Sequence, residues 1–201
     1  MTYIATVAYD DSTGRLRQLY DRVKGPDNNV DNIMMAHSLR PHTMEGHMAI
    51  YKYVLHHSAN TVPKWFLEAI GVLVSHVNNC NYCVEHHFAG MARLLGDRPR
   101  ADAMRAALEA GRYGDAFDAR EQAALDYAAK LTRAASSISK SDIEAMRNAG
   151  YDDGQILEIN QVAAYFSYAN RTVLGLGVTT DGDILGLSPN NSDDPNDWSH
   201  R

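Results

Sequence analysis

Five residues between positions 68 and 87 have the side-chain types needed for thiol chemistry. The chain has only two cysteines, Cys80 and Cys83, in the spacing C-x2-C, with Tyr82 between them. His87 follows Cys83 by four residues, and Glu68 precedes Cys80 by twelve. Two cysteines cannot form a disulfide framework. Without an export signal, the C-x2-C spacing indicates redox or metal chemistry instead.

A helix is predicted to carry both sulfurs on one face. The asparagines Asn78 and Asn79 are residue types that commonly begin a helix, and an apolar pattern with helical spacing follows them. On this helix Cys80, Cys83 and His87 occupy positions i, i+3 and i+7, so the imidazole lies on the same face as the thiols. Both cysteines would lie in the first turn, where free backbone N–H groups and the helix dipole favour a thiolate.

The preceding segment, residues 65–77, is apolar on all sides and is therefore predicted to be a buried helix. Apart from His76, Glu68 is its only acidic or basic residue. Burial tends to raise the pKa of a carboxyl group, which would suit a proton acceptor near neutral pH. If the chain reverses near Asn78, an antiparallel hairpin brings Glu68 level with His87.

The spacing E-x11-C-x2-C-x3-H resembles the active-site pattern of the AhpD-like alkylhydroperoxidases, which belong to the carboxymuconolactone decarboxylase superfamily. The likeness is greatest to the peroxidase-related branch, in which a tyrosine such as Tyr82 is usual between the cysteines. Three flanking segments are also similar to that branch: LYD at 19–21, NIMMAHSLRP at 32–41 and ILEINQVAAYFSYANR at 156–171. The resemblance covers most of residues 15–178.

This resemblance implies an all-α AhpD-like domain whose helical hairpins pack in a homo-oligomer, a trimer or a hexamer. It also implies a thiol-dependent peroxidase in which Glu68 and His87 relay a proton from Cys83. The Cys83 thiolate would attack a hydroperoxide and become a sulfenic acid, and Cys80 would attack that sulfur to form a disulfide. An external dithiol or thiol protein would then reduce the disulfide. No metal, haem, flavin or other cofactor is implied.

One position departs from the prototype peroxidase, which has a histidine where this chain has Tyr82. A neutral tyrosine, with an unperturbed pKa of about 10, is a poorer relay base at pH 7. It can still donate or accept a hydrogen bond. The alternative function is therefore a disulfide oxidoreductase or a redox sensor with the same fold. The intact cysteine pair argues against the lactone chemistry of family members that lack it.

A non-enzymatic alternative is a helical oligomer in which the cysteine pair is a structural staple or a zinc clip. Together with His87 the cysteines could supply three zinc ligands, and His86 or His76 could supply a fourth. A single helical turn seldom completes a tetrahedral site, and the chain has no second C-x2-C. His86 is otherwise expected on the surface or in packing contacts, and His56, His57 and His76 are assigned structural roles.

Composition predicts one domain with a substantial core, residues 1–187, followed by a polar tail, residues 188–201. The chain has 201 residues, of which 45% are hydrophobic. Its net charge of −6 disfavours nucleic acid and anionic membranes as partners. No apolar run reaches the length of a membrane span, and the first residues lack a secretory signal, so a cytoplasmic location is expected. The tail is expected to be disordered or to pack on a neighbour.

The hydrophobic pattern itself predicts an all-α domain, because no segment shows sustained two-residue alternation. Two capping boxes are predicted, one formed by Asp118 and Glu121 and the other by Ser141 and Glu144. Proline and capping residues predict further helix starts near residues 12, 31, 41, 63, 80, 99 and 152.

Overall fold

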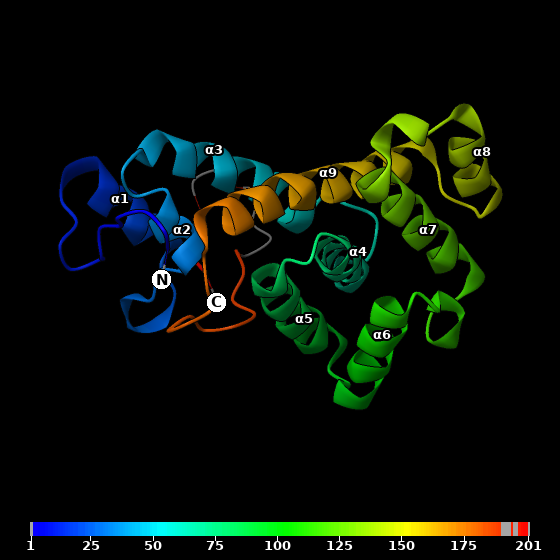
Figure 1. The fold of residues 1–201 in the computed structure, drawn as a ribbon, viewed down its shortest axis with the longest axis horizontal. Coiled ribbons are helices and arrows are strands. Elements are labelled where there is room, and N and C mark those ends of the chain that lie inside the picture. The colour runs from blue at the N-terminus through cyan, green and yellow to red at the C-terminus, as the bar shows by residue number, and fades with distance from the viewer. Residues whose placement is uncertain (1, 190–193, 195–196, 201) are drawn as a thin grey trace.

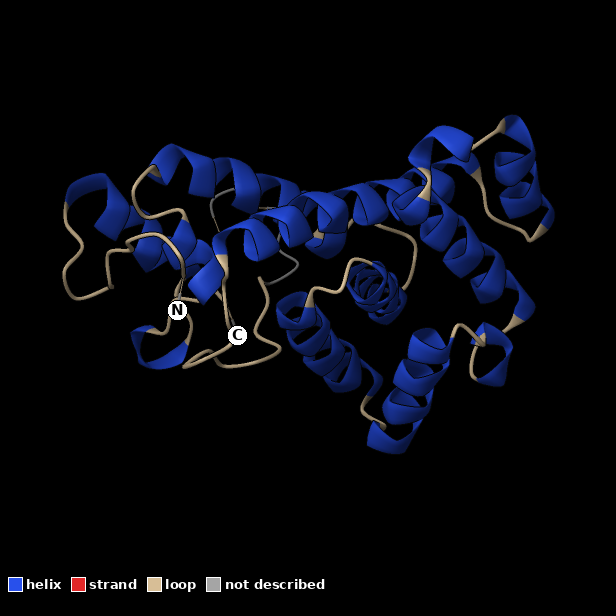
Figure 2. Cartoon of the chain, in the orientation of Figure 1, coloured by secondary structure: helices blue, strands red, loops and turns tan. Residues whose placement is uncertain are grey.

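A computed structural model of the protein describes residues 2–189, 194 and 197–200. Their regular structure is helical, apart from an isolated antiparallel bridge between Pro189 and His200 (Figure 2). The α-helices of these residues are α1 (Gly14–Val23), α2 (Asn32–Ala36), α3 (Pro41–Tyr51), α4 (Lys64–Val77), α5 (Asn81–Leu95), α6 (Arg98–Ala110), α7 (Ala119–Arg133), α8 (Lys140–Asn148) and α9 (Asp153–Leu176). The predicted all-α class is confirmed. None of the described helices combines the length and apolarity needed to span a bilayer.

Helix α4 lies at the centre of the fold. Figure 1 shows it end-on, with the long helix α9 on one side and helices α5 and α6 on the other. Residues 66–75 of α4 are all buried, because apolar side chains surround almost its whole circumference. Helix α9 approaches α4 closely at Gly71, where an added Cβ would lie 2.3 Å from the ring of Phe166. The carboxylate of Glu68 is therefore placed in the protein interior, between packed helices.

Of the two predicted capping boxes, one lies at the predicted position and the other is shifted by two residues. The capping box predicted at Asp118 is present at the start of α7. The next box is formed by Ser139 and Asp142, two residues before the pair predicted from Ser141. The Asp142 carboxylate also accepts hydrogen bonds from Nζ of Lys130 on α7, at 2.6 and 2.8 Å. This contact between helices favours the earlier start.

Helix α3 continues at its C-terminus into a π-helical turn, Lys52–His56. Turns of this type are rare and frequently lie at functional sites. The side chains of Lys52 and His56 are both buried. Nζ of Lys52 donates a hydrogen bond to the carbonyl oxygen of Asp194 at 2.8 Å. The turn thus connects the core to a residue of the C-terminal tail.

The described residues of the tail lie against the domain. Trp198 and His200 are buried, and the guanidinium carbon of Arg22 lies 3.7 Å from the centre of the Trp198 ring. The sequence predicted disorder or packing on a neighbour for the tail, and these described residues pack on their own domain, through the Trp198 ring and the Lys52 hydrogen bond. The other tail residues, 190–193, 195–196 and 201, lie outside the described residues. The domain boundary at residue 187 stays a prediction.

Candidate active site

The two cysteines lie where the chain turns from α4 into α5. Asn78 follows the last residue of α4, and Asn79 adopts a left-handed backbone conformation with φ of 56°. Asparagine tolerates this conformation better than most residues. Cys80 is the N-cap residue of α5, and Asn81 is its first helical residue. The asparagines thus form the turn, and the predicted helix start is wrong by one or two residues.

The two thiols are buried, free of a disulfide, and electrostatically unequal. The hydrogen bond between them lowers the pKa of Cys80, whereas the same bond and burial raise the pKa of Cys83 well above its ordinary value. Asn170 on α9 hydrogen-bonds to both thiols and favours their ionised forms. Its own side chain is fixed by Ser75, at 3.0 Å, and by Asn78, at 2.9 Å. Ionisation of Cys83 therefore needs a base.

A base of the expected kind lies on the α4–α5 hairpin. Nδ1 of His87 donates a hydrogen bond to Oε2 of Glu68 at 2.6 Å. A carboxylate that accepts the Nδ1 proton leaves Nε2 of the imidazole free to accept another proton. Oε1 of Glu68 lies 3.8 Å from Nε2 of His56, a buried nitrogen with no hydrogen-bond partner among the described residues. The hairpin thus makes the predicted Glu68–His87 contact, and the π-helical turn Lys52–His56 adds a second imidazole near Glu68.

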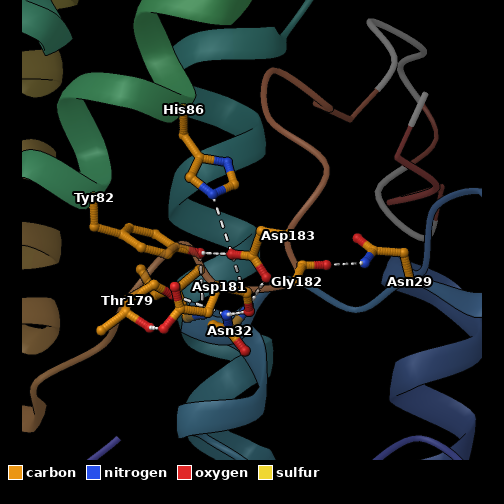
Figure 3. Close-up of polar contacts among 9 residues, drawn as sticks. Asn29, Asn32, Tyr82, His86, Thr179, Asp181, Gly182 and Asp183 are labelled. Atoms are coloured by element: carbon orange, nitrogen blue, oxygen red, sulfur yellow. Dashed lines mark hydrogen bonds and ion pairs between the residues drawn. The ribbon is translucent and has the colours of Figure 1, made fainter. Parts of the chain in front are cut away.

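Tyr82 belongs to a different polar cluster, drawn in Figure 3. Its hydroxyl donates a hydrogen bond to Oδ2 of Asp183 at 2.8 Å, and Nε2 of His86 lies 3.1 Å from the same oxygen. The backbone N–H of Asn32 donates to Oδ1 of Asp183 at 3.0 Å. Burial and the nearby carboxylates raise the pKa of Tyr82 well above its ordinary value. Tyr82 is thus a fixed hydrogen-bond donor and is poorly suited to act as a base.

His86 is buried in this cluster, which agrees with the packing role and not with the surface position among the two alternatives expected for it. Its partner Asp183 lies in the segment after α9, and nothing in the residue spacing connects the two positions. The zinc alternative gains no support from this geometry. Among the described residues, no three His, Cys, Asp or Glu side chains are grouped in a way that could hold a metal ion.

A cavity of about 30 Å³ brings the two clusters together. Helix α5 lines it with Tyr82, Cys83, His86 and His87, and α4 lines it with Glu68. Cys83 is the only cysteine among the described residues that line this cavity. The volume is enough for about two water molecules. The thiol whose ionisation needs a base therefore faces the same space as the Glu68–His87 pair.

Aromatic rings surround another part of the cavity. The ring centre of Tyr51 lies 4.8 Å from that of His56, 6.0 Å from that of His87 and 6.4 Å from that of His200. Tyr165 of α9 stacks on Tyr51 with ring centres 5.5 Å apart. Burial and the charge of Glu68 raise the pKa of Tyr51 well above its ordinary value. These rings limit access of bulk water to the relay.

Several site residues were missed by sequence reasoning. His56 was assigned a structural role, and Asn170, Asp183 and His200 were not considered as site residues, nor was Asp31, which also lines the cavity. Asn170 had one usable signal, since it is a polar side chain in the middle of a long apolar helix. The other four give no comparable signal, because they lie in turns or in polar segments.

Solved structures with the same fold connect this site to known proteins. A peroxidase-related protein from Silicibacter sp. TM1040 is 29% identical, with a TM-score of 0.68 over 75% of this chain and 76% of its own. An AhpD-core, peroxidase-related protein from Ralstonia eutropha JMP134 is 22% identical, with a TM-score of 0.75 over 89% of this chain and 91% of its own. No protein-family sequence model and no curated protein sequence matches the chain. The resemblance to the AhpD-like, peroxidase-related proteins is thus supported by structure.

The same fold also serves another reaction. A variant of the debrominase Bmp8 in complex with 2,3,4-tribromopyrrole is 16% identical to this chain, with a TM-score of 0.70 over 89% of this chain and 91% of its own. At this identity the likeness concerns the fold alone. The fold therefore indicates an enzyme family, and the reaction must be argued from the site.

Proposed function

We propose that this chain, an AhpD-like peroxidase-related protein, reduces hydroperoxides through its two cysteines. One observation carries the proposal. Cys83 faces a cavity that is also lined by His87, whose Nδ1–H is bonded to Glu68 at 2.6 Å. This arrangement joins a buried thiol to a base that is itself oriented by a carboxylate, which is the usual way in which a cysteine nucleophile is activated.

The proposed cycle has three balanced steps. First, His87 accepts the proton of the Cys83 thiol, and the thiolate attacks the terminal oxygen of the hydroperoxide. The O–O bond breaks, the leaving oxygen takes up the proton, and the products are an alcohol or water and the Cys83 sulfenic acid. Second, Cys80 attacks the sulfenic sulfur, so that a disulfide forms and water leaves. Third, an external dithiol reduces this disulfide and is itself oxidised to a disulfide.

The environment of Cys80 suits the second step. Its pKa is lowered by the hydrogen bond with Cys83, so a larger fraction of Cys80 is thiolate than of a free thiol. Cys80 precedes Cys83 by three residues at the start of α5. A sulfenic acid at Cys83 is therefore next to a reactive thiol and can be trapped before further oxidation.

The test is a stopped-flow assay of the reduced protein with hydrogen peroxide, followed by mass spectrometry. We expect one equivalent of peroxide to be consumed and the mass to fall by two hydrogens, with both changes reversed by a dithiol. His87→Gln should slow oxidation strongly. His76→Gln on α4 is the matched control and should not. A reduced protein that consumes no peroxide would refute the proposal.

The same samples separate the other reactions of this fold. A disulfide oxidoreductase would exchange with small disulfides without consuming peroxide. A debrominase would release bromide from a brominated pyrrole in the presence of a dithiol. A redox sensor would be oxidised by peroxide but would not turn over with excess reductant. Each result would replace the peroxidase proposal by a named alternative.

We also propose that the protein forms a homo-oligomer, a trimer or a hexamer. Large apolar side chains are exposed on two helices that run side by side in Figure 1: Ile50 on α3, and Leu157, Tyr168 and Leu174 on α9. Exposed apolar side chains on neighbouring helices can pair with the same surface of another copy. Light scattering after size exclusion should give three or six times the monomer mass, and a monomer would contradict the proposal.

A further inference from the structure

We propose that residues 179–188, here called the cover, restrict the cavity to very small oxidants, and that Asp183 is the residue that holds the cover closed. The substrate class that follows is hydrogen peroxide rather than bulky organic hydroperoxides. The choice of oxidant rests on the proposed peroxidase function. The restriction on size rests on the cavity and on the contacts of the cover.

The size of the cavity is the first observation. Its volume is about 30 Å³, and the cover contributes Gly186, Leu187 and Ser188 to its lining. Hydrogen peroxide has two oxygen atoms and occupies roughly the space of two waters, which this volume accommodates. A hydroperoxide with an aromatic ring or an acyl chain does not fit beside Cys83 unless the lining moves.

Asp183 anchors the cover through three donors on two other elements, as Figure 3 shows. Its carboxylate accepts hydrogen bonds from the Tyr82 hydroxyl at 2.8 Å and from the backbone N–H of Asn32 at 3.0 Å. Nε2 of His86 lies 3.1 Å from the same carboxylate. The Asp183 side chain is only 2% exposed. Hydrogen bonds to a buried carboxylate are among the strongest that a loop can make.

Two asparagine side chains hold the start of the cover by hydrogen bonds to its backbone carbonyl groups. Nδ2 of Asn32 donates to the carbonyl oxygens of Thr179 and Asp181, at 2.8 and 2.9 Å. Nδ2 of Asn29 donates to the carbonyl oxygen of Gly182 at 3.2 Å (Figure 3). These bonds fix the backbone immediately before the position from which Asp183 extends. The cover is therefore bonded to the residues around α2 as well as to α5.

The other end of the cover packs without a gap. Gly186 has a φ of 81°, and an added Cβ would lie 2.9 Å from the Cβ of Ala89 on α5. An added Cβ at Gly25 would lie 2.6 Å from Cδ1 of Leu187. Gly186 and Leu187 of the cover are thus in direct contact with α5 and with Gly25. Movement of the cover away from the cavity would break these contacts and those of Asp183.

The test measures access to Cys83 without relying on peroxide chemistry. In the Cys80→Ser background Cys83 is the only thiol, and its alkylation rate is measured with iodoacetamide and with N-(1-pyrenyl)maleimide. Each rate is divided by the rate of the same reagent with glutathione. We expect the cover to slow both reagents, and the normalised rate to be at least about tenfold lower for the bulky maleimide, because it needs a wider opening of the cover than iodoacetamide does.

Two substitutions should open the cover, and one should leave it closed. Asp183→Ala should raise the normalised maleimide rate by about tenfold to hundredfold, as expected when charge-assisted hydrogen bonds are lost. Leu187→Ala should raise it by a smaller factor, and it serves independently if the first variant does not fold. The matched control is Asp181→Ala, since the exposed Asp181 carboxylate bonds to Thr179 within the cover. Circular dichroism checks the fold of each variant.

A second experiment compares hydrogen peroxide with cumene hydroperoxide on the reduced protein with both cysteines present. We expect hydrogen peroxide to react faster, and both opening variants to narrow the difference. A size-selective alkylation without reaction of either hydroperoxide would refute the peroxidase proposal and leave the size restriction supported. Equal normalised rates for the two alkylating reagents in the wild type would overturn the restriction. If Asp183→Ala and Leu187→Ala both leave the normalised maleimide rate unchanged, the cover does not control access to Cys83.

Discussion

Helix α5 presents two neighbouring rows of side chains to one cavity, and the rows differ in what holds them. The first row is Cys83 and His87, and the second is Tyr82 and His86. His87 is bonded to a carboxylate 19 residues away, on the helix that immediately precedes α5. Tyr82 is bonded to Asp183, 101 residues away, in the segment that follows α9.

The difference shows how one helix can separate chemistry from access. In the first row, a thiol with a raised pKa lines the same cavity as an imidazole oriented by Glu68, and the proposed proton exchange depends on this arrangement. In the second row, burial raises the pKa of Tyr82 so far that its proton stays on the hydroxyl, bonded to Asp183. The first row is thus suited to reaction, and the second to holding a loop in place. Substitutions in the two rows should therefore have different effects.

The largest effect is expected from the cysteines. Cys83→Ser should abolish peroxide consumption, because Cys83 is the thiol that faces the cavity. Cys80→Ser should leave one turnover and a sulfenic acid at Cys83 that dimedone traps. Stopped-flow rates and mass spectrometry of the trapped peptide check both outcomes. A sulfenic acid at Cys80 instead would mean that the thiol with the lowered pKa is the one that attacks.

The next largest effect is expected from the partner of His87. Glu68→Gln should slow peroxide reduction by roughly 10²-fold at pH 7, the size typical of removing a positioned base or its orienting group. The rate should recover only at high pH, because the hydrogen bond with Cys80 and burial hold the pKa of the unassisted Cys83 thiol well above its ordinary value. The measurement is the oxidation rate against pH, with circular dichroism as a control for folding. An unchanged rate and profile would assign Glu68 a purely structural role.

Acid should change the contributions of buried histidines and of Asp31 to the free energy of unfolding in opposite directions. Burial lowers the pKa of His47 to about 3 and of His200 to about 4, so the unfolded chain binds more protons at these positions between those values and about 6.5. Their contribution to stability is complete above pH 6.5 and is lost as the pH falls. Burial raises the pKa of Asp31 to about 7, so its contribution has the opposite sign and grows as the pH falls from 7 towards 4.

The lowered histidine pKa values outweigh the raised pKa of Asp31. The free energy of unfolding should therefore fall between pH 7.5 and pH 5, by roughly 1–2 kcal/mol per buried histidine. Asp31→Asn should make this fall steeper, because the opposing contribution is removed. Urea unfolding at the two pH values measures both effects. A variant with the same pH dependence as the wild type would show that Asp31 titrates normally in the folded protein.

The smallest effect on activity is expected in the second row. Tyr82→Phe should change the rate with hydrogen peroxide by less than about tenfold, because a fixed donor does not exchange protons with the thiol. The free energy of unfolding should fall by about 1–3 kcal/mol, because the buried Asp183 loses a donor. Tyr53→Phe, at an exposed position of the π-helical turn, is the matched control. A loss of activity as large as that of Glu68→Gln would place Tyr82 in the relay.

The first row could be predicted from the sequence because it is local. Residues 64–95 contain an apolar helix, a turn and a second helix, and helical periodicity fixes which side chains meet across such a hairpin. The contact between Glu68 and His87 follows from that geometry. Only the details of the turn were wrong, because a left-handed residue at Asn79 delays the start of α5 by one or two residues.

The second row could not be predicted, because its geometry depends on the path of an irregular segment. Asp183 has no periodic pattern around it, and its distance in sequence from Tyr82 gives no information about contact. The contacts of the C-terminal tail were also not predictable from the sequence. Its polar composition favoured disorder, yet Trp198 and His200 are buried, and the carbonyl oxygen of Asp194 accepts a hydrogen bond from Lys52. Long-range contacts of this kind are decided by packing, and a single sequence does not reveal packing.

The π-helical turn Lys52–His56 has a consequence for the register of the chain. A π-helical turn holds more residues than an α-helical one, and successive residues of an α-helix are about 100° apart around its axis. Deletion of one residue from this turn would let α3 continue as a regular helix and would rotate His56 away from Glu68. The one extra residue in this turn therefore acts like an insertion. It changes the direction of the His56 side chain, so that the imidazole points into the interior towards Glu68.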